Sequence, residues 1–234
     1  IFFFKIWYTR FNQLNESEDI KMDILETMKA RHSVRQYKNQ AIESSKREKI
    51  NALIKDVNAE SKLSIQVFYD EPKCFDSFMA HYGKFENVKN YIAIVGNKND
   101  QEKAGYYGEK IVLKCQKLGL NTCWVAMTHG KSKAQIKRGQ KLLIIISLGY
   151  GETQGVPHKS KSIAELGQAD QKNEWFEKGM EAVSLAPTAV NQQKFYFELK
   201  NGIVTAKNLG GFYSRIDLGI VKYHFEVVTG HEVK

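Results

Sequence analysis

The chain has 234 residues, 42% of them hydrophobic, and a formal net charge of +9. This length suits one large domain or two small ones with a buried core, and no segment has the length and apolar character of a membrane span, so we expect a soluble protein. The positive charge favours anionic partners, but acids are interleaved with the lysines and no block typical of a nucleic-acid-binding arm is present, so a lysine-rich solvated surface is the preferred explanation of the excess.

The three cysteines and six histidines form no pattern typical of a disulfide framework or a metal site. Cys74, Cys115 and Cys123 show no C-x-x-C spacing, and the last two lie in or beside apolar stretches, where cysteine behaves as a small hydrophobe. An odd number of cysteines without a framework indicates a reducing compartment, and we expect a cytoplasmic protein. The histidines show no H-x-x-x-H spacing, so we expect no metal site.

The first 21 residues, IFFFKIWYTRFNQLNESEDIK, are aromatic but interrupted by Lys5 and Arg10. They are too short and too charged for a membrane span, and no small-residue cleavage site follows them. The chain begins with Ile, whereas Met22 opens the first well-patterned helix. We therefore interpret residues 1–21 as an extension outside the domain formed by residues 22–234; an N-terminal arm packed on a neighbour is the alternative.

Hydrophobic periodicity predicts alternating helices and buried strands in the first two thirds of the chain. Asp23 is placed to cap the first helix, which runs through Ala30. Further helices are predicted to begin at 43–45 and to span 103–118, and the predicted strands span 62–69, 91–97, 122–126 and 142–149. Several of these strands are unbroken apolar runs, which predicts a central sheet covered on both faces.

After Gly151 the sequence predicts a surface loop, a helix over 171–186 that Pro187 ends, a hairpin, and a final helix over 213–228. The hairpin consists of FYFEL and IVTAK around the turn signal KNG. The stretch AGYYGEKIVLKCQKLG (104–119) is similar to GGFYSRIDLGIVKYHF (210–225). This similarity indicates either an internal duplication with pseudo-two-fold symmetry or a chance likeness between two amphipathic helices.

The segment RHSVRQY (31–37) follows the first helix and concentrates hydrogen-bond donors. Two guanidinium groups, an imidazole and a hydroxyl can converge on a phosphate through charge-assisted hydrogen bonds. A solvated turn with a few ion pairs is the alternative interpretation of this segment taken alone.

A second polar segment, APTAVNQQKFYFEL (186–199), joins a helix to a strand. The short side chains of Thr188 and Asn191, together with exposed backbone N–H groups, can present donors and acceptors to a planar heterocycle. An ordinary helix-to-strand corner with an Asx-turn is the simpler interpretation.

Two further stretches complete a set of four: LGLNTCWVA (118–126), and LGYG (148–151) followed by HKSKSIAEL (158–166). Together the four resemble the FMN-dependent nitroreductase family. That family has a helix leading into R-[RH]-S-x-R-x-[YF], an A-P-S-A-x-N-x-Q-P-W turn, an L-G-L-G-T-C-W strand entry, and a G-Y-P strand end followed by K-x-[KR]. The resemblance covers most of the chain from Met22 onward. It implies an α+β, nitroreductase-like fold with a central mixed or antiparallel sheet flanked by helices.

The resemblance also implies which residues bind FMN. The family segment that holds the phosphate, the ribityl chain and the pyrimidine edge corresponds to Arg31, His32, Ser33 and Arg35. The late basic pair at the phosphate corresponds to Lys159 and Lys161. The turn against the isoalloxazine ring corresponds to Pro187, Thr188, Asn191 and Gln192. The strand entry beside the flavin, where we expect packing rather than chemistry, corresponds to Thr122, Cys123 and Trp124.

The order of the motifs departs from the family pattern. In most of the family the A-P-S-A-x-N turn follows soon after the arginine segment, whereas the matching turn here lies far towards the C-terminus. We interpret this as a subgroup with a rearranged or duplicated half, in which the two segments meet within a pseudo-symmetric monomer or across a homodimer interface. Lys194 and Phe195 stand where the family has Pro-Trp, and no segment matches the one whose backbone N–H contacts flavin N5.

The resemblance implies an enzyme that passes hydride from NAD(P)H through flavin N5 to an electron-poor acceptor, such as a nitroaromatic or a quinone, in ping-pong turnover. An FMN enzyme of the same fold with another reaction is the alternative: reductive dehalogenation, flavin degradation or dehydrogenation. Those branches carry lid insertions, and residues 75–90 are the candidate lid here. A basic nucleic-acid-binding protein is a third hypothesis, but the aromatic residues mostly occupy core-like positions, so we expect no nucleic-acid partner.

Overall fold

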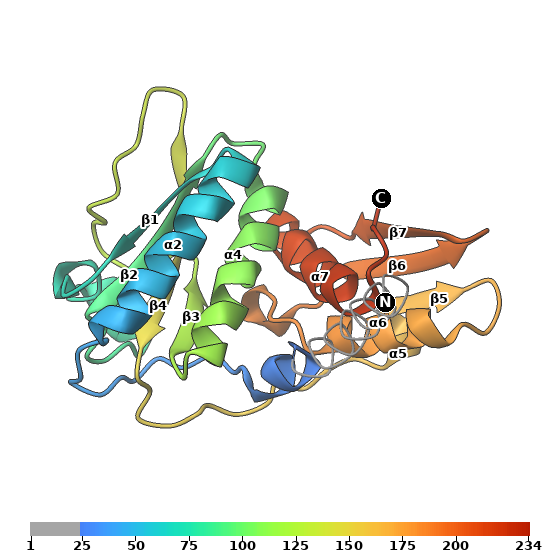
Figure 1. Cartoon of the computed structure of the whole chain (residues 1–234), viewed down its shortest axis with the longest axis horizontal. Coiled ribbons are helices and arrows are strands. Elements are labelled where there is room, and N and C mark those ends of the chain that lie inside the picture. The colour runs from blue at the N-terminus through green and yellow to red at the C-terminus, as the bar shows by residue number, and fades with distance from the viewer. Residues whose placement is uncertain (1–23) are drawn as a thin grey trace, which may run out of the picture.

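The computed structural model describes residues 24–234 (Figure 1). The predicted extension over 1–21 and the predicted cap at Asp23 lie outside the described residues. Residues 24–30 are helical and lead into the segment 31–37, as the sequence predicts. Within the described part of the chain, no helix is long and apolar enough to cross a membrane.

Helices and strands follow the predicted order through the first two thirds of the chain. The helices are α2 (Ser44–Ser61), α3 (Phe78–Tyr82), α4 (Gln101–Lys117), α5 (Ile163–Leu166), α6 (Glu174–Ser184) and α7 (Ser214–Thr229), with short 3-10 turns η1 (Pro72–Cys74) and η2 (Ala189–Asn191). The strands are β1 (Ser64–Phe68), β2 (Asn90–Gly96), β3 (Asn121–Val125), β4 (Lys141–Gly149), β5 (Gly167–Ala169), β6 (Phe195–Lys200) and β7 (Ile203–Asn208).

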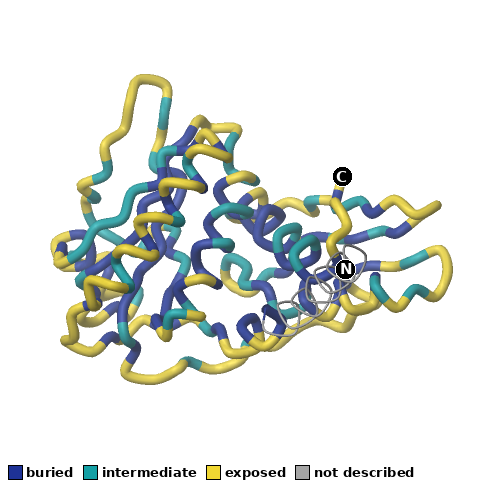
Figure 2. The backbone as a smooth tube through the Cα atoms, viewed as in Figure 1, coloured by how far each residue is buried: buried dark blue, intermediate teal, exposed yellow. Residues whose placement is uncertain are grey.

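The larger sheet has the order β1-β2-β4-β3, and every neighbouring pair in it is antiparallel. Alternate side chains of β2 enter two different cores, because a strand presents successive residues to opposite faces. Ile92 and Ile94 pack with residues of α2 and α4. Tyr91 and Ala93 pack on the other face, against a cluster that includes Phe75. The expected α+β fold, with an antiparallel sheet covered on both faces, is confirmed, and Figure 2 shows the buried strands at its centre.

The smaller sheet has the order β5-β6-β7 and contains the predicted hairpin. Asn201 and Gly202, at φ 52° and 75°, form the turn. A two-residue turn needs positive φ at both positions to match the right-handed twist of the strands that it joins. The predicted helix over 171–186 is shorter at its start, because Asn173 caps α6 by accepting the Phe176 N–H. Neither α5 nor β5 was predicted from the sequence. β5 is three residues long and exists through parallel pairing with β6, which local periodicity cannot reveal.

Helices α4 and α7 cross so closely that their backbones touch (Figure 1). A methyl group at Gly105 would overlap the Ile216 carbonyl, and one at Gly219 would overlap the Glu102 carbonyl. The contacts are reciprocal and equally spaced along the two helices, as expected for a local two-fold relation within one chain. Gly105 is therefore the spatial counterpart of Gly219.

The sequence similarity between 104–119 and 210–225 uses a different register, in which Gly105 aligns with Gly211. Tyr106 lies inside α4, whereas Phe212 precedes α7. Gly105 and Gly219 match one another across the contact, but the aromatic pairs that suggested an internal duplication are not equivalent, and the duplication stays a prediction.

We expect Gly105→Ala and Gly219→Ala each to lower the free energy of unfolding by about 1–3 kcal/mol, because the added methyl group has no room between the two backbones. The direction of this change tests the crossing, since Gly→Ala at an open position of a helix would raise the free energy of unfolding by about 1 kcal/mol. Urea denaturation measures the effect. Lys114→Ala, at an exposed position of α4, is the matched control and should stay within about 0.5 kcal/mol of the parent. An unchanged or higher stability of both glycine variants would contradict the close crossing.

Candidate functional site

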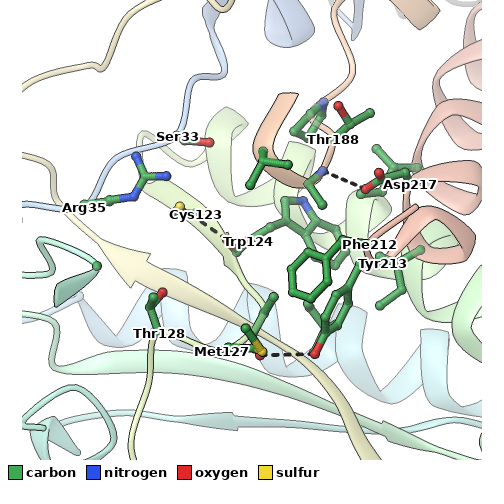
Figure 3. Close-up of a pocket in the computed structure, with 18 of the residues that line it drawn as sticks. Ser33, Arg35, Cys123, Trp124, Met127, Thr128, Thr188, Phe212, Tyr213 and Asp217 are labelled. Atoms are coloured by element: carbon green, nitrogen blue, oxygen red, sulfur yellow. Dashed lines mark hydrogen bonds between the residues drawn. The ribbon is translucent and has the colours of Figure 1, made fainter. Parts of the chain in front are cut away.

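A cavity of about 520 Å³ lies where the larger sheet meets the N-terminal end of α7 (Figure 3). This volume is typical of small-molecule sites. Its polar lining consists of Ser33, Arg35, Lys84, Thr128, Thr188 and Asp217. Its aromatic and large apolar lining consists of Tyr82, Trp124, Met127, Ile144, Phe212, Tyr213, Ile216 and Ile220. The lining thus combines segments from both ends of the chain.

Ser33 and Arg35 reach the cavity because the segment 31–37 runs alongside β3. The Val34 N–H donates to the Thr122 carbonyl at 3.0 Å, and Ser33 bridges Thr122 in parallel register. Val34 is buried in the core, so the alternating side chains of Ser33 and Arg35 point the other way. Arg35 forms no ion pair with the described residues, which leaves its charge available at the cavity.

One wall of the cavity is aromatic. The Trp124 indole N–H donates to a carboxylate oxygen of Glu109 at 2.9 Å, and the ring packs against Gly108, where no side chain intervenes. Phe212 and Tyr213 meet edge to face with ring centroids 4.6 Å apart, and the Tyr213 hydroxyl donates to the Ala126 carbonyl. Hydrogen bonds therefore hold both Trp124 and Tyr213 in fixed orientations along the wall.

A second part of the lining is the turn after Pro187, which Asp217 of α7 holds in place. One carboxylate oxygen of Asp217 accepts the Ala189 N–H at 2.9 Å, and the other accepts the Gln192 side-chain amide at 2.7 Å. Val190 and Asn191 adopt positive φ, which non-glycine residues seldom do. Burial raises the pKa of Asp217 to about 6, partly opposed by these two hydrogen bonds. The Asp217 carboxylate thus holds the turn through both of its oxygens, and its pKa is raised.

The structure brings together six of the residues predicted from the sequence. The cavity is lined by Ser33, Arg35, Cys123, Trp124, Pro187 and Thr188. Burial raises the pKa of the Cys123 thiol, which agrees with a packing role. Thr122 is buried in β3, outside the lining.

The other predicted residues of the second half form hydrogen bonds within that half of the chain. The Asn191 amide donates to the Lys159 carbonyl at 2.9 Å, and the Lys161 ammonium donates to the Gln193 carbonyl at 3.1 Å. Gln192 donates to Asp217. None of Lys159, Lys161, Asn191 and Gln192 is among the residues that line the cavity.

Arg31 lies behind the cavity in a buried ionic cluster. Its Nε is 3.9 Å from Glu109, which also contacts His224 Nε2 at 3.0 Å, and all three side chains are buried. The Arg31 Nε and Nη1 atoms have no hydrogen-bond partner among the described residues. Burial lowers the pKa of Arg31, and burial followed by the Arg31 charge lowers the pKa of the neighbouring His32. The cluster therefore contains unused donor capacity next to the predicted phosphate segment.

Sequence reasoning missed several residues of the site. Lys84 falls within residues 75–90, which were noted as a candidate lid, and Phe212 falls within the stretch noted for internal similarity. Glu109 and Asp217 are acids among the mostly apolar buried residues of α4 and α7, and this pattern is their only signal.

Comparison with known proteins identifies the family. A family model described as "Putative TM nitroreductase" matches residues 23–229. The chain belongs to this nitroreductase family. No curated protein matches the chain.

One solved structure shares the fold, and two further nitroreductase structures align over a smaller part of this chain. The structure of "a putative nitroreductase (tm1586)" from Thermotoga maritima is 24% identical and aligns with a TM-score of 0.61, covering 88% of this chain and 82% of that one. A Desulfovibrio desulfuricans nitroreductase in complex with FMN is 15% identical, with a TM-score of 0.48 over 61% of this chain and 93% of that one. An FMN-dependent nitroreductase from Clostridium difficile is 22% identical, with a TM-score of 0.44 over 60% of this chain and 92% of that one.

We expect Glu109→Gln to lower the free energy of unfolding by about 3–5 kcal/mol, because it leaves the charge of Arg31 buried without a counter-charge and weakens the contact with His224 Nε2. Burial alone would raise the pKa of Glu109, but the contacts with His224, Arg31 and Trp124 hold it below its usual value. A lowered pKa in the folded state means that the stabilisation is present at neutral pH and is lost as the pH falls through that pKa.

Chemical denaturation at neutral and acidic pH, followed by tryptophan fluorescence, measures this effect. The difference between the parent and Glu109→Gln should shrink at acidic pH. Glu48→Gln, at an exposed position of α2, is the control and should change stability by less than about 0.5 kcal/mol. A Glu109→Gln protein as stable as the parent at neutral pH would show that the cluster carries no net stabilisation.

Proposed function

We propose that the protein is an FMN-dependent oxidoreductase whose flavin occupies the cavity beside Trp124. The observation that supports this most directly is the convergence of Ser33, Arg35, Trp124 and Thr188, predicted from separate motifs, on one cavity of one chain. Membership of a nitroreductase family and the FMN bound by a structural relative agree with it.

The residues fit the chemistry of FMN. The cofactor combines a planar tricycle that has a hydrogen-bonding edge with a polar chain that ends in a phosphate. The cavity offers flat apolar walls at Trp124 and Tyr213, and cations at Arg35 and Lys84. The unpartnered Nε and Nη1 atoms of buried Arg31 add donor capacity of the kind that an anion satisfies. The site therefore has both an aromatic part and a cationic part.

Each lining residue has a role in this proposal. When bound, FMN would supply reversible hydride transfer at its ring. Arg35 would place a positive charge beside the bound ring, and the hydroxyls of Ser33 and Thr188 would offer hydrogen bonds to its polar edge. Trp124 excludes water from one side of the cavity. We propose Lys84 as the second cation of the site, since it lines the cavity and the predicted pair Lys159 and Lys161 does not.

NAD(P)H is the proposed reductant, and an electron-poor small molecule such as a nitroaromatic or a quinone is the proposed acceptor. Two features support a small planar acceptor. The cavity is lined largely by aromatic and aliphatic side chains, and the exposed side chains of Met127 and Val190 extend this apolar character to its edge. Stacking on such walls favours flat, aromatic ligands.

We expect the purified protein to be yellow, and Arg35→Ala to weaken FMN binding by about 10-fold to 100-fold, because a charge-assisted hydrogen bond is worth about 1.5–3 kcal/mol. Quenching of flavin fluorescence on titration measures the dissociation constant. Arg138→Ala, at an exposed position between β3 and β4, removes the same charge away from the cavity and should bind FMN like the parent. A parent protein that retains no FMN would rule out the proposed function, and equal affinity in the two arginine variants would rule out the role of Arg35.

A second prediction concerns the pH dependence that Asp217 introduces. Its pKa in the folded protein is raised to about 6, so the turn after Pro187 is held by a full carboxylate above that pH and by a protonated group below it. We expect flavin affinity to fall as the pH drops through about 6. Riboflavin is the better ligand for this test, because the phosphate of FMN itself titrates near pH 6.

Asp217→Asn should bind riboflavin more weakly at pH 8, since an amide cannot accept from both donors that the carboxylate engages. The inflection near pH 6 should also disappear. If the inflection persists in Asp217→Asn, another group is responsible for it.

A further inference from the structure

A second cavity, of about 540 Å³, lies against the same Phe212 and Tyr213 that line the candidate site. It is formed where α4 and α7 begin and β4 starts. The two aromatic residues separate the two spaces. A ligand long enough to pass Phe212, whose side chain is partly exposed, can occupy both.

This second cavity is cationic. Lys98, Lys141 and Arg215 line it, and no carboxylate does. None of these three side chains forms an ion pair with the described residues, whereas lysines elsewhere on the same two helices do: Lys110 pairs with Glu60 and Lys222 pairs with Glu102. An uncompensated group of three cations around one hollow favours an anionic ligand.

The backbone adds to this charge. The first residues of α4 and α7 line the cavity, and the N–H groups of a first helical turn have no partner within the helix. Their partial positive charge has the same sign as the three side chains. The nearest helix-start acid, Asp100, is engaged by the Asn97 N–H and by Lys103.

We propose that this cavity binds the phosphate groups of the nucleotide reductant whose ring enters the candidate site. This inference rests on the proposed function. A pyridine nucleotide carries a planar ring and a diphosphate on one molecule, and the two adjoining cavities offer an aromatic space and a cationic space on either side of Phe212 and Tyr213. Inorganic phosphate shares the same chemistry, and the experiment separates the two sources.

The test compares a triple variant, Lys98→Ala/Lys141→Ala/Arg215→Ala, with a control triple variant of equal net charge, Lys55→Ala/Lys172→Ala/Lys200→Ala, at exposed positions away from both cavities. Calorimetry measures binding of ADP and of inorganic phosphate to the flavin-loaded protein. We expect the first variant to bind ADP at least about 10-fold more weakly than the parent, since each charge-assisted contact is worth about 1.5–3 kcal/mol. The control should bind ADP like the parent, and both variants should keep FMN.

In turnover, the first variant should show a KM for NADH raised by a similar factor with kcat unchanged, because only uniform binding is removed. Equal ADP affinity in the two triple variants, with FMN retained, would overturn the inference while leaving the flavin assignment intact. Inorganic phosphate that binds as tightly as ADP would also overturn it, because the cavity would then recognise a free anion. Loss of FMN from the parent would instead overturn the proposed function.

Discussion

The contact between α4 and α7 at Gly105 and Gly219 is the constraint on which the site depends. The two helices belong to opposite halves of the chain, and they approach so closely only because neither glycine has a side chain there. α7 carries Asp217, which holds the turn after Pro187, while the sheet packed under α4 carries the strand beside Ser33. The crossing therefore sets how far the turn held by Asp217 lies from the strand beside Ser33.

The same crossing buries a network of charges. Glu109 projects from α4, His224 from α7, and Arg31 from the end of the first helix, and the three meet with almost no exposure to solvent. Removing a carboxylate from water costs several kcal/mol, and the Arg31 guanidinium, the contact with His224 Nε2 and the indole N–H of Trp124 offset this cost. Since Trp124 also forms a wall of the cavity, the orientation of that wall and the association of the helices depend on one carboxylate.

Much of the fold follows from local patterns, and the exceptions have physical reasons. The unbroken apolar run of β2 and the Asn-Gly turn between β6 and β7 are visible in the sequence because their signals are contiguous. β5 cannot be predicted from the sequence, because its three residues form a strand only by pairing with Phe197 and its neighbours in β6. Ser33 and Thr188 could be found from motifs, whereas Lys84 and Asp217 reach the cavity from elements that carry no motif. Their contribution depends on tertiary packing.

The displaced ring-contacting turn shows why the order of motifs along the chain is a poor guide to their arrangement in space. Thr188 is far from Ser33 in the sequence, yet both line one cavity of a single chain, so no second copy is needed to bring them together. What makes this possible is the entry into α7. Gly210 and Gly211 adopt positive φ, and Tyr213 is left-handed at the start of the helix, so the segment leaves the extended conformation of β7 before α7 begins. This conformation places Phe212 and Tyr213 between an aromatic cavity and a cationic one. Residues 210–213 thus determine how the two cavities connect. They thereby determine which molecules can extend from one cavity into the other.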